Sequence, residues 1–142
     1  MNQPSQQSGS APASRGQGQT IDLIEKINLI HGHWQPRVVA EMNDYQFKVV
    51  KIAGDFIWHS HGDTDETFIV LEGEMRIEVR GPFGNTSEII LRAGQMAVVP
   101  KGVEHKPCAV GEVKLLLIEP RGVANTGDHA PSALTVANDQ WV

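Results

Sequence analysis

Three histidines and one glutamate are the residues of this sequence whose types and spacing point most clearly to chemistry. They are His59, His61, Glu66 and His105. Imidazole suits zinc, copper, iron and nickel, whereas a carboxylate also suits a harder ion such as manganese. His59 and His61 are two residues apart, and on a β-strand such side chains point to the same face. The four residues therefore predict a site for one divalent transition metal, with Fe, Mn, Zn, Ni and Cu not distinguishable.

Turn residues surround these side chains in two stretches of the chain. A polar break over residues 62–65 lets the chain bring Glu66 back beside the two histidines, and a Pro100-Lys101-Gly102 turn precedes His105. The first stretch reads Gly54-x4-His59-x-His61-x4-Glu66-x6-Gly73, and the second reads Gly94-x5-Pro100-x-Gly102-x2-His105.

The two stretches resemble the two motifs of the cupin superfamily, which are small β-barrels with a metal in the barrel mouth. The resemblance covers roughly residues 38–119. It implies an all-β fold, the cupin jelly roll or double-stranded β-helix barrel, in a small single-domain protein. It also implies that His59, His61, Glu66 and His105 are the metal ligands. The first glycine lies one residue closer to His59 than is usual, and Ala109 stands where a longer form of the second motif ends in Asn.

Short apolar stretches between turn residues predict the strands of this barrel. We expect strands at residues 37–42, 45–53, 56–59, 66–71, 75–80, 87–91, 96–99, 104–108 and 113–119. Many short strands without intervening helices indicate an all-β barrel or sandwich. Residues 37–120 are thus the predicted barrel, and residues 121–142 form a C-terminal extension that lies over the barrel mouth or along a dimer seam.

The segment before the barrel divides into a tail and an arm. Residues 1–19 are rich in Gln, Ser, Gly, Ala and Pro without an apolar run, which predicts a disordered tail and neither a signal peptide nor a membrane span. Residues 20–36 form a helix or an extended arm: Thr20 and Asp22 are candidate caps for a helix over residues 21–30. Trp34 is expected to pack this arm onto the barrel. His31-Gly32-His33 repeats the His-x-His spacing, but no carboxylate follows at a matching distance, so we expect no second metal site there.

Strand alternation predicts the walls of the pocket beside the metal. Counting from Glu66 puts Phe68 and Val70 inside, and counting from His105 puts Val103 and Pro107 inside. The strand from residue 45 adds one of two sets. These are Tyr45, Phe47 and Val49, which would make the pocket largely apolar, or Gln46, Lys48 and Val50.

Composition limits the classes of partner. The chain has 142 residues, which fits one domain, and a net charge of -5, which argues against a nucleic-acid partner. Cys108 is the single cysteine, so an intrachain disulfide is excluded, and alternation points it away from the metal. We expect a cytoplasmic protein that binds a small molecule, with no membrane partner. Exposed edges of an antiparallel sheet and the cupin resemblance both favour a homodimer.

The predicted site allows two classes of function. A six-coordinate ion with four protein ligands keeps two open positions, which suits a metal-dependent isomerase, dioxygenase or lyase acting on a small oxygenated molecule. The alternative is a non-catalytic module or sensor that binds a metal or a small ligand. The catalytic residues are unknown: Asp63 and Asp65 are explained equally well as solvated turn residues, and Arg121 and His129 better as parts of a solvated loop. No organic cofactor is predicted.

Overall fold

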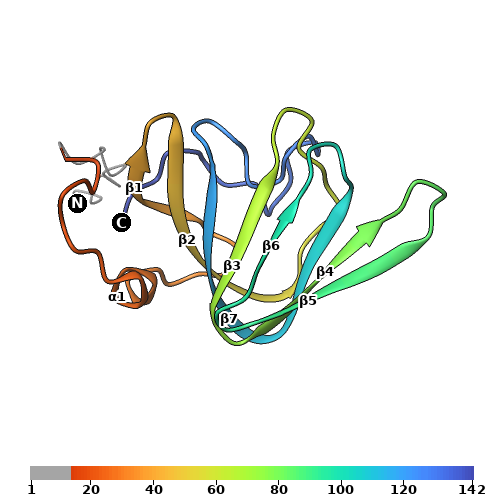
Figure 1. Ribbon diagram of the computed structural model, residues 1–142, viewed down its shortest axis with the longest axis horizontal. Helices are drawn as coiled ribbons and strands as arrows, with labels where there is room; N and C mark the ends of the chain where they lie inside the picture. Colours follow the sequence, from red (N-terminus) through yellow and green to blue (C-terminus); the bar gives the residue numbers. More distant parts are fainter. Residues whose placement is uncertain (1–13) are drawn as a thin grey trace, which may run out of the picture.

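The computed structural model describes residues 14–142, and most of its regular structure is β-strand (Figure 1). One helix, α1 (Leu23–Asn28), comes before the strands. The strands are β1 (Arg37–Met42), β2 (Tyr45–Asp55), β3 (Glu66–Glu72), β4 (Glu74–Arg80), β5 (Thr86–Arg92), β6 (Met96–Val99) and β7 (His105–Pro120). The predicted mostly-β fold with a short N-terminal helix is confirmed. In residues 14–142, no helix is long and apolar enough to cross a membrane.

The N-terminal segment lies against β1 where the structure describes it. Most of the predicted tail, residues 1–13, lies outside the described residues. Beyond them, the backbone N–H of Glu41 in β1 donates to the Arg15 carbonyl oxygen at 2.9 Å, and Gln17 Nε2 donates to the Glu41 carbonyl oxygen at 3.2 Å.

The helix is shorter than the predicted span of residues 21–30. Asp22 is its N-cap and accepts the backbone N–H of Glu25 on Oδ1 at 2.9 Å, as one of the two candidate caps should. The last turn is tightened by N–H groups of Leu29 and Ile30 that bond three residues back, so the helix ends at Asn28. Trp34 then packs on the barrel as predicted: its ring stacks on Phe56, with ring centroids 4.6 Å apart.

Strand β7 organises the sheet. On one side it pairs with β2 along both of its halves. On the other side its C-terminal half pairs with β3 and its N-terminal half with β4, which in turn pairs with β5. The predicted strands 104–108 and 113–119 are therefore one continuous strand, because β2 pairs with both of them. The pairing of β2 with β7 has an irregular register between Ile52 and Gly54, where Gly54 has a φ of +73° that suits glycine.

The predicted strand at residues 56–59 is wrong. Only an isolated bridge between His59 and His105 forms there, through two backbone hydrogen bonds of 3.0 and 2.9 Å. At its other end the Phe56 N–H donates to the Pro107 carbonyl oxygen at 2.9 Å. These contacts with the start of β7 fix His59 but do not extend into a ladder.

The two faces of β2 pack against different parts of the molecule. Phe47 and Val49 face α1 and form an outer cluster with Ile27 and Val39. Gln46, Lys48 and Val50 are buried on the opposite face, so the second of the two predicted sets points inward. The interior cluster consists of Val50, Ile52, Phe68, Val70, Met75, Ile77, Leu91, Val99, Ala109, Val113, Leu115 and Leu117.

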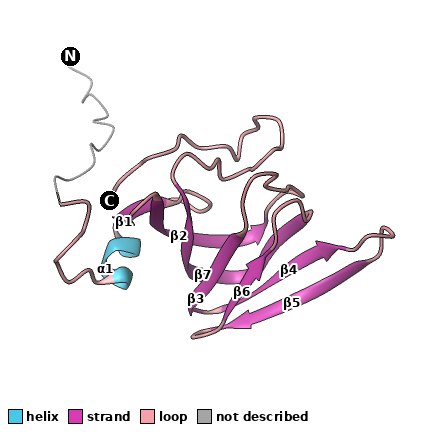
Figure 2. Ribbon diagram, turned by 45° about the horizontal axis from the view of Figure 1, so that its top comes forward, coloured by secondary structure: helices cyan, strands magenta, loops and turns pink. Residues whose placement is uncertain are grey.

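The C-terminal segment after β7 crosses one end of the strands and returns to β1 (Figure 2). Around Asp128 it lies against the loop after His59, where the Asp128 N–H donates to the Ser60 carbonyl oxygen at 2.8 Å and Asp128 Oδ2 accepts the Gly62 N–H at 2.8 Å. Its end forms a parallel bridge between Trp141 and Val38. These contacts place the segment over one end of the barrel, as one of the two predicted positions requires, and its position along a dimer seam stays a prediction.

Candidate metal centre

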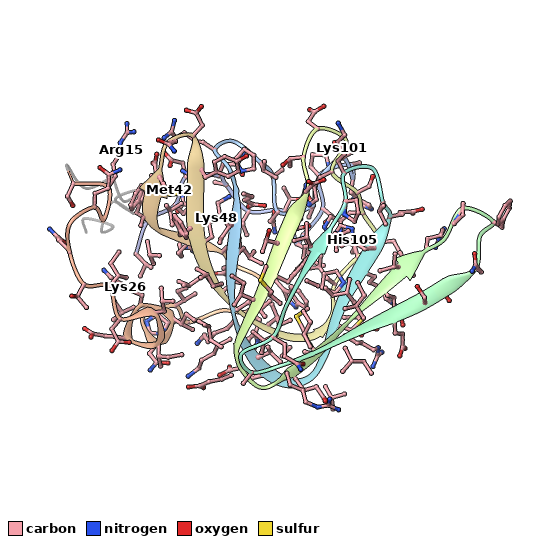
Figure 3. The ribbon with its side chains drawn as sticks, in the orientation of Figure 1. Arg15, Lys26, Met42, Lys48, Lys101 and His105 are labelled. Carbon is pink, nitrogen blue, oxygen red and sulfur yellow. The ribbon has the colours of Figure 1, made fainter. Side chains whose placement is uncertain are left out.

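Each of the four candidate ligands lies at the start of a strand or on a segment fixed to one. Glu66 begins β3 and His105 begins β7, and the backbone bridge to His105 holds His59. His61 is fixed two residues later, where its carbonyl oxygen accepts the Gly102 N–H at 2.8 Å. Figure 3 labels His105 among the strands, with Lys101 in the loop above it.

The structure brings the four side chains together in one buried cluster. One potential ligand atom from each lies within 4.8 Å of all the others. Glu66 Oε2 is 2.8 Å from His61 Nε2, 2.9 Å from His105 Nε2 and 4.0 Å from His59 Nε2. All four residues are buried. The cluster predicted from the spacing of the sequence is therefore present as a geometric arrangement.

Backbone carbonyls orient two of the rings. His59 Nδ1 is 2.9 Å from the Ile57 carbonyl oxygen, and His105 Nδ1 is 2.9 Å from that of Val103. A carbonyl oxygen only accepts, so each Nδ1 must carry the proton and donate it. In the neutral rings the lone pair is then on Nε2, which faces the cluster.

This arrangement calls for a positive charge in the middle of the cluster. A neutral His105 would present a lone pair to Glu66 Oε2 at 2.9 Å, and two acceptors at that distance repel each other unless a proton or a metal ion lies between them. His59 Nε2 and His61 Nε2 are buried without a hydrogen-bond partner. The contact of His61 with Glu66 is thus close but not aligned as a hydrogen bond. A metal ion would satisfy all four atoms, so the residues fit one.

The protonation preferences of His59 and Glu66 agree with a neutral imidazole and a carboxylate, whereas that of His61 shows the pull of the nearby acidic charges. Burial, together with the charge of His105, lowers the pKa of His59 to about 4. Burial raises the pKa of Glu66, but its contacts with His105 and His61 outweigh this and lower it to about 2. Burial also lowers the pKa of His61, but the contact with Glu66 and the nearby acidic charges raise it overall. Glu66 is therefore a permanent negative charge at neutral pH.

A narrow, mostly apolar cavity opens beside the cluster. Its empty volume is about 430 Å³, including the open solvent at its mouth. His59 and Glu66 form part of its wall, and Phe68 and Pro107 line it as alternation predicted. The remaining lining residues are Trp34, Pro36, Val50, Ile52, Phe56, Leu115, Leu117, Glu119 and Asn125.

Sequence reasoning missed a buried ion pair at this cavity. Lys48 Nζ lies 2.7 Å from Glu119 Oε1, and the two side chains are only 5% and 3% exposed. Burial raises the pKa of Glu119, and attraction to Lys48 opposes this only in part. Lys48 belongs to one of the two predicted inward sets. Glu119 could have been found by counting in twos from Leu115 and Leu117, which line the same cavity.

Other polar residues considered from the sequence lie outside the cavity lining. His33 Nε2 contacts Glu112 Oε2 at 2.9 Å in an exposed pair, and in residues 14–142 only the cluster around Glu66 could hold a metal ion. Arg121 pairs with the buried Glu41. His129 is exposed and its Nδ1 contacts the Ala130 carbonyl oxygen.

Two more of these residues have structural surroundings. Asp65 accepts the Lys101 N–H on Oδ1 at 2.9 Å, which ties together the two loops that carry the candidate ligands. Cys108 is buried, and burial raises the pKa of its thiol to about 11, so the thiol stays protonated.

Comparisons with known proteins place the fold in a family. Residues 47–119 match the Cupin_2 family, described as a cupin domain. A crystal structure of a cupin-2 domain containing protein from Shewanella frigidimarina NCIMB 400 is 55% identical, with a TM-score of 0.66 over 71% of this chain and 94% of that one. The uncharacterized protein YdbB of Bacillus subtilis (strain 168) is 37% identical over 68 residues, which are 48% of this chain. The matched part spans only 57% of that relative's length.

A more distant likeness concerns a metal enzyme. The structure of hydroquinone 1,2-dioxygenase PnpCD in complex with Fe³⁺ is 21% identical, with a TM-score of 0.65 over 79% of this chain and 35% of that one. At this identity the likeness concerns the fold alone.

Proposed function

The chain belongs to the cupin family, and from this premise we propose that it is a metal-dependent enzyme that acts on a small oxygenated molecule. One divalent transition metal would be held by Nε2 of His59, His61 and His105 and by Oε2 of Glu66. The reaction would be of the isomerase, dioxygenase or lyase type. The distant likeness to a hydroquinone dioxygenase keeps the dioxygenase type among these without selecting it.

The observation that carries the proposal is the pair of buried imidazole nitrogens without hydrogen-bond partners. His59 Nε2 and His61 Nε2 converge with His105 Nε2 on one carboxylate oxygen. Leaving such atoms buried and unsatisfied costs about 1–3 kcal/mol each, so a protein keeps them where a ligand satisfies them. A divalent ion with this single carboxylate ligand would keep a net charge of +1.

The metal, the backbone carbonyls and the apolar wall would each have a separate role in binding a substrate. The ion would supply Lewis acidity toward a substrate oxygen through the positions that the protein leaves open. The Ile57 and Val103 carbonyl oxygens hold two imidazoles in the tautomer that exposes Nε2. The apolar wall beside the cluster, which includes Phe68, would bind the hydrocarbon part of a small molecule and exclude water.

Metal content tests the ligand set. We would purify the protein without added metal, measure bound Fe, Mn, Zn, Ni and Cu by elemental analysis, strip the protein with a chelator and reload each ion separately. Glu66→Gln and His105→Ala should lower metal content well below the wild-type ratio. His33→Ala is the matched control because His33 also contacts a glutamate, but at the surface, and it should leave metal content unchanged.

A substrate screen of the reloaded protein separates the two classes of function. An enzyme would form product in proportion to metal occupancy, and activity would return with the metal. A binding module would show saturable ligand binding without product at any occupancy. If replacing His59 and His61 together by alanine changed neither metal content nor activity, the proposed site would be wrong.

A further inference from the structure

Glu119 lies beside the candidate metal cluster in the same sheet. On one side it pairs with Gln46 of β2. On the other side Thr67 pairs with Ile118, so the next position in this antiparallel register sets Glu119 next to Glu66. Both carboxylates are buried and both line the same cavity. A second charged residue is therefore built into the wall next to a candidate ligand.

Glu119 has an oxygen available to a molecule in the cavity. Lys48 donates to Oε1, and within residues 14–142 no hydrogen bond reaches Oε2. Because Oε2 is also not one of the fully buried atoms that lack a partner, it keeps some accessible surface. Asn125, the other polar neighbour, has both ends of its amide held by the backbone: its Nδ2 donates to the Leu134 carbonyl oxygen and its Oδ1 accepts the Val136 N–H. Away from the metal cluster, Glu119 is the charged residue in the cavity lining.

Stability alone is a weak reason for this ion pair. A buried pair often contributes no more than apolar side chains of the same size, because removing two charges from water offsets their attraction. Lys48 has one further contact, with the Val123 carbonyl oxygen at 3.5 Å. Its clearest effect is to fix the Glu119 carboxylate in position and to favour its ionised form.

We infer that Glu119 is a specificity-determining contact, whose Oε2 accepts a hydrogen bond from a hydroxyl group of a small neutral molecule while another oxygen of that molecule reaches the metal position. Lys48 is the positioning residue for Glu119. This inference rests on the proposed function and names its substrate class, a hydroxylated compound with an apolar body.

The charges and the walls of the cavity both favour this class. Lys48 is already matched by Glu119, so a phosphate or a carboxylate group placed beside Glu119 would meet an acceptor rather than a donor. The stacked rings of Trp34 and Phe56 give the wall a flat apolar surface. A hydroxyl group would donate a hydrogen bond to the carboxylate, and the apolar body of the molecule would pack against the apolar wall.

Matched pairs of ligands test the hydroxyl contact. Binding of 1,2-, 1,3- and 1,4-benzenediol, and of the monomethyl ether of each, would be measured by calorimetry on the metal-loaded protein. At least one diol should bind about tenfold or more tightly than its ether, because the ether lacks the second donor to a charged acceptor. If no diol were preferred to its ether, the inference would be overturned.

Variants then assign the preference to Glu119. Glu119→Gln should reduce it to a few fold or less. The double variant Lys48→Met with Glu119→Met removes both charges at similar volume, and it should abolish the preference even if the single variant folds poorly. Glu41→Gln is the control: Glu41 is also buried and paired with an arginine, but it does not line the cavity, so the preference should persist.

Metal content separates this inference from the proposed function. All three variants should retain the wild-type metal content, because none changes a candidate ligand. A wild-type protein that binds no metal refutes the proposed function, whatever Glu119 does. A metal-loaded double variant that keeps the wild-type diol preference refutes only the role of Glu119.

Discussion

Replacing Lys48 alone should destabilise the fold strongly and in a pH-dependent way. In Lys48→Met the Glu119 carboxylate, which is 3% exposed, loses its partner at 2.7 Å and must be protonated to stay buried. Protonating a carboxyl with an ordinary pKa of about 4.3 costs about 4 kcal/mol at pH 7. This agrees with the cost of about 3–5 kcal/mol for breaking a buried ion pair.

The pH dependence follows from the direction of the pKa shift. Burial raises the pKa of Glu119 even beside Lys48, and without Lys48 it rises further. The unfolded chain then releases a proton that the folded variant keeps, so the variant loses stability as pH rises above about 4.3. Wild type shares this loss only until the pH passes its own, less strongly raised Glu119 pKa, and above that pH the difference between the two proteins grows. The difference between wild type and variant should change by up to about 1.4 kcal/mol per pH unit.

Urea unfolding of the metal-free proteins at pH 7 and pH 5 measures this difference. Arg92→Met is the control: Arg92 also lies 2.7 Å from its partner, Glu74, but these side chains are 68% and 57% exposed, so its cost should stay within about 1 kcal/mol. Replacing Lys48 and Glu119 together by methionine should recover most of the loss. If the loss in Lys48→Met were below about 1 kcal/mol, or equal at both pH values, the reasoning that Glu119 is a desolvated charge would be refuted.

Three further predictions concern the metal, the C-terminal segment and assembly. The metal-free protein should stay folded because the interior apolar cluster does not need the ion, and metal at about 100 times its dissociation constant should add about 2.7 kcal/mol in thermal unfolding; a random-coil circular dichroism spectrum after chelation would contradict this. Gly127→Ala should lower both the melting temperature and metal retention, because a Cβ there collides with the Ser60 carbonyl oxygen next to His61, whereas Gly84→Ala meets open space and should cost less. The protein should sediment as a homodimer at micromolar concentration, where a lone 15.5 kDa species would count against it.

The candidate ligands could be predicted because their spacing is local. His59, His61 and Glu66 lie within eight consecutive residues, and the turn before His105 marks where the second motif begins. The geometry that holds them was predicted less well. The two histidines were expected to share a strand face, but His59 is fixed by a single bridge and His61 by a loop contact to Gly102. Long-range backbone hydrogen bonds leave no periodic signal in the sequence.

The inward face of β2 shows a different limit of sequence reasoning. Alternation limits the choice to two sets, but hydrophobicity favours Tyr45, Phe47 and Val49, whereas the structure turns Lys48 inward. The reason is that β2 has apolar neighbours on both faces, with α1 covering Val49 on the outside. Lys48 is buried there because it forms an ion pair with Glu119 of β7. That pairing depends on the register between β2 and β7, which could not be predicted from the sequence.

The two neighbouring carboxylates have opposite pKa shifts for a physical reason. Glu66 faces imidazoles, and its contacts with them keep its pKa low despite full burial. Glu119 faces one ammonium group and an apolar cavity, so burial dominates and its pKa rises. Two glutamates opposite each other on neighbouring strands would thus provide a permanent charge toward the candidate metal and a hydrogen-bond acceptor toward the cavity. Replacing the imidazoles around Glu66, or Lys48 beside Glu119, would therefore change what each carboxylate can bind, although the carboxylates themselves stay the same.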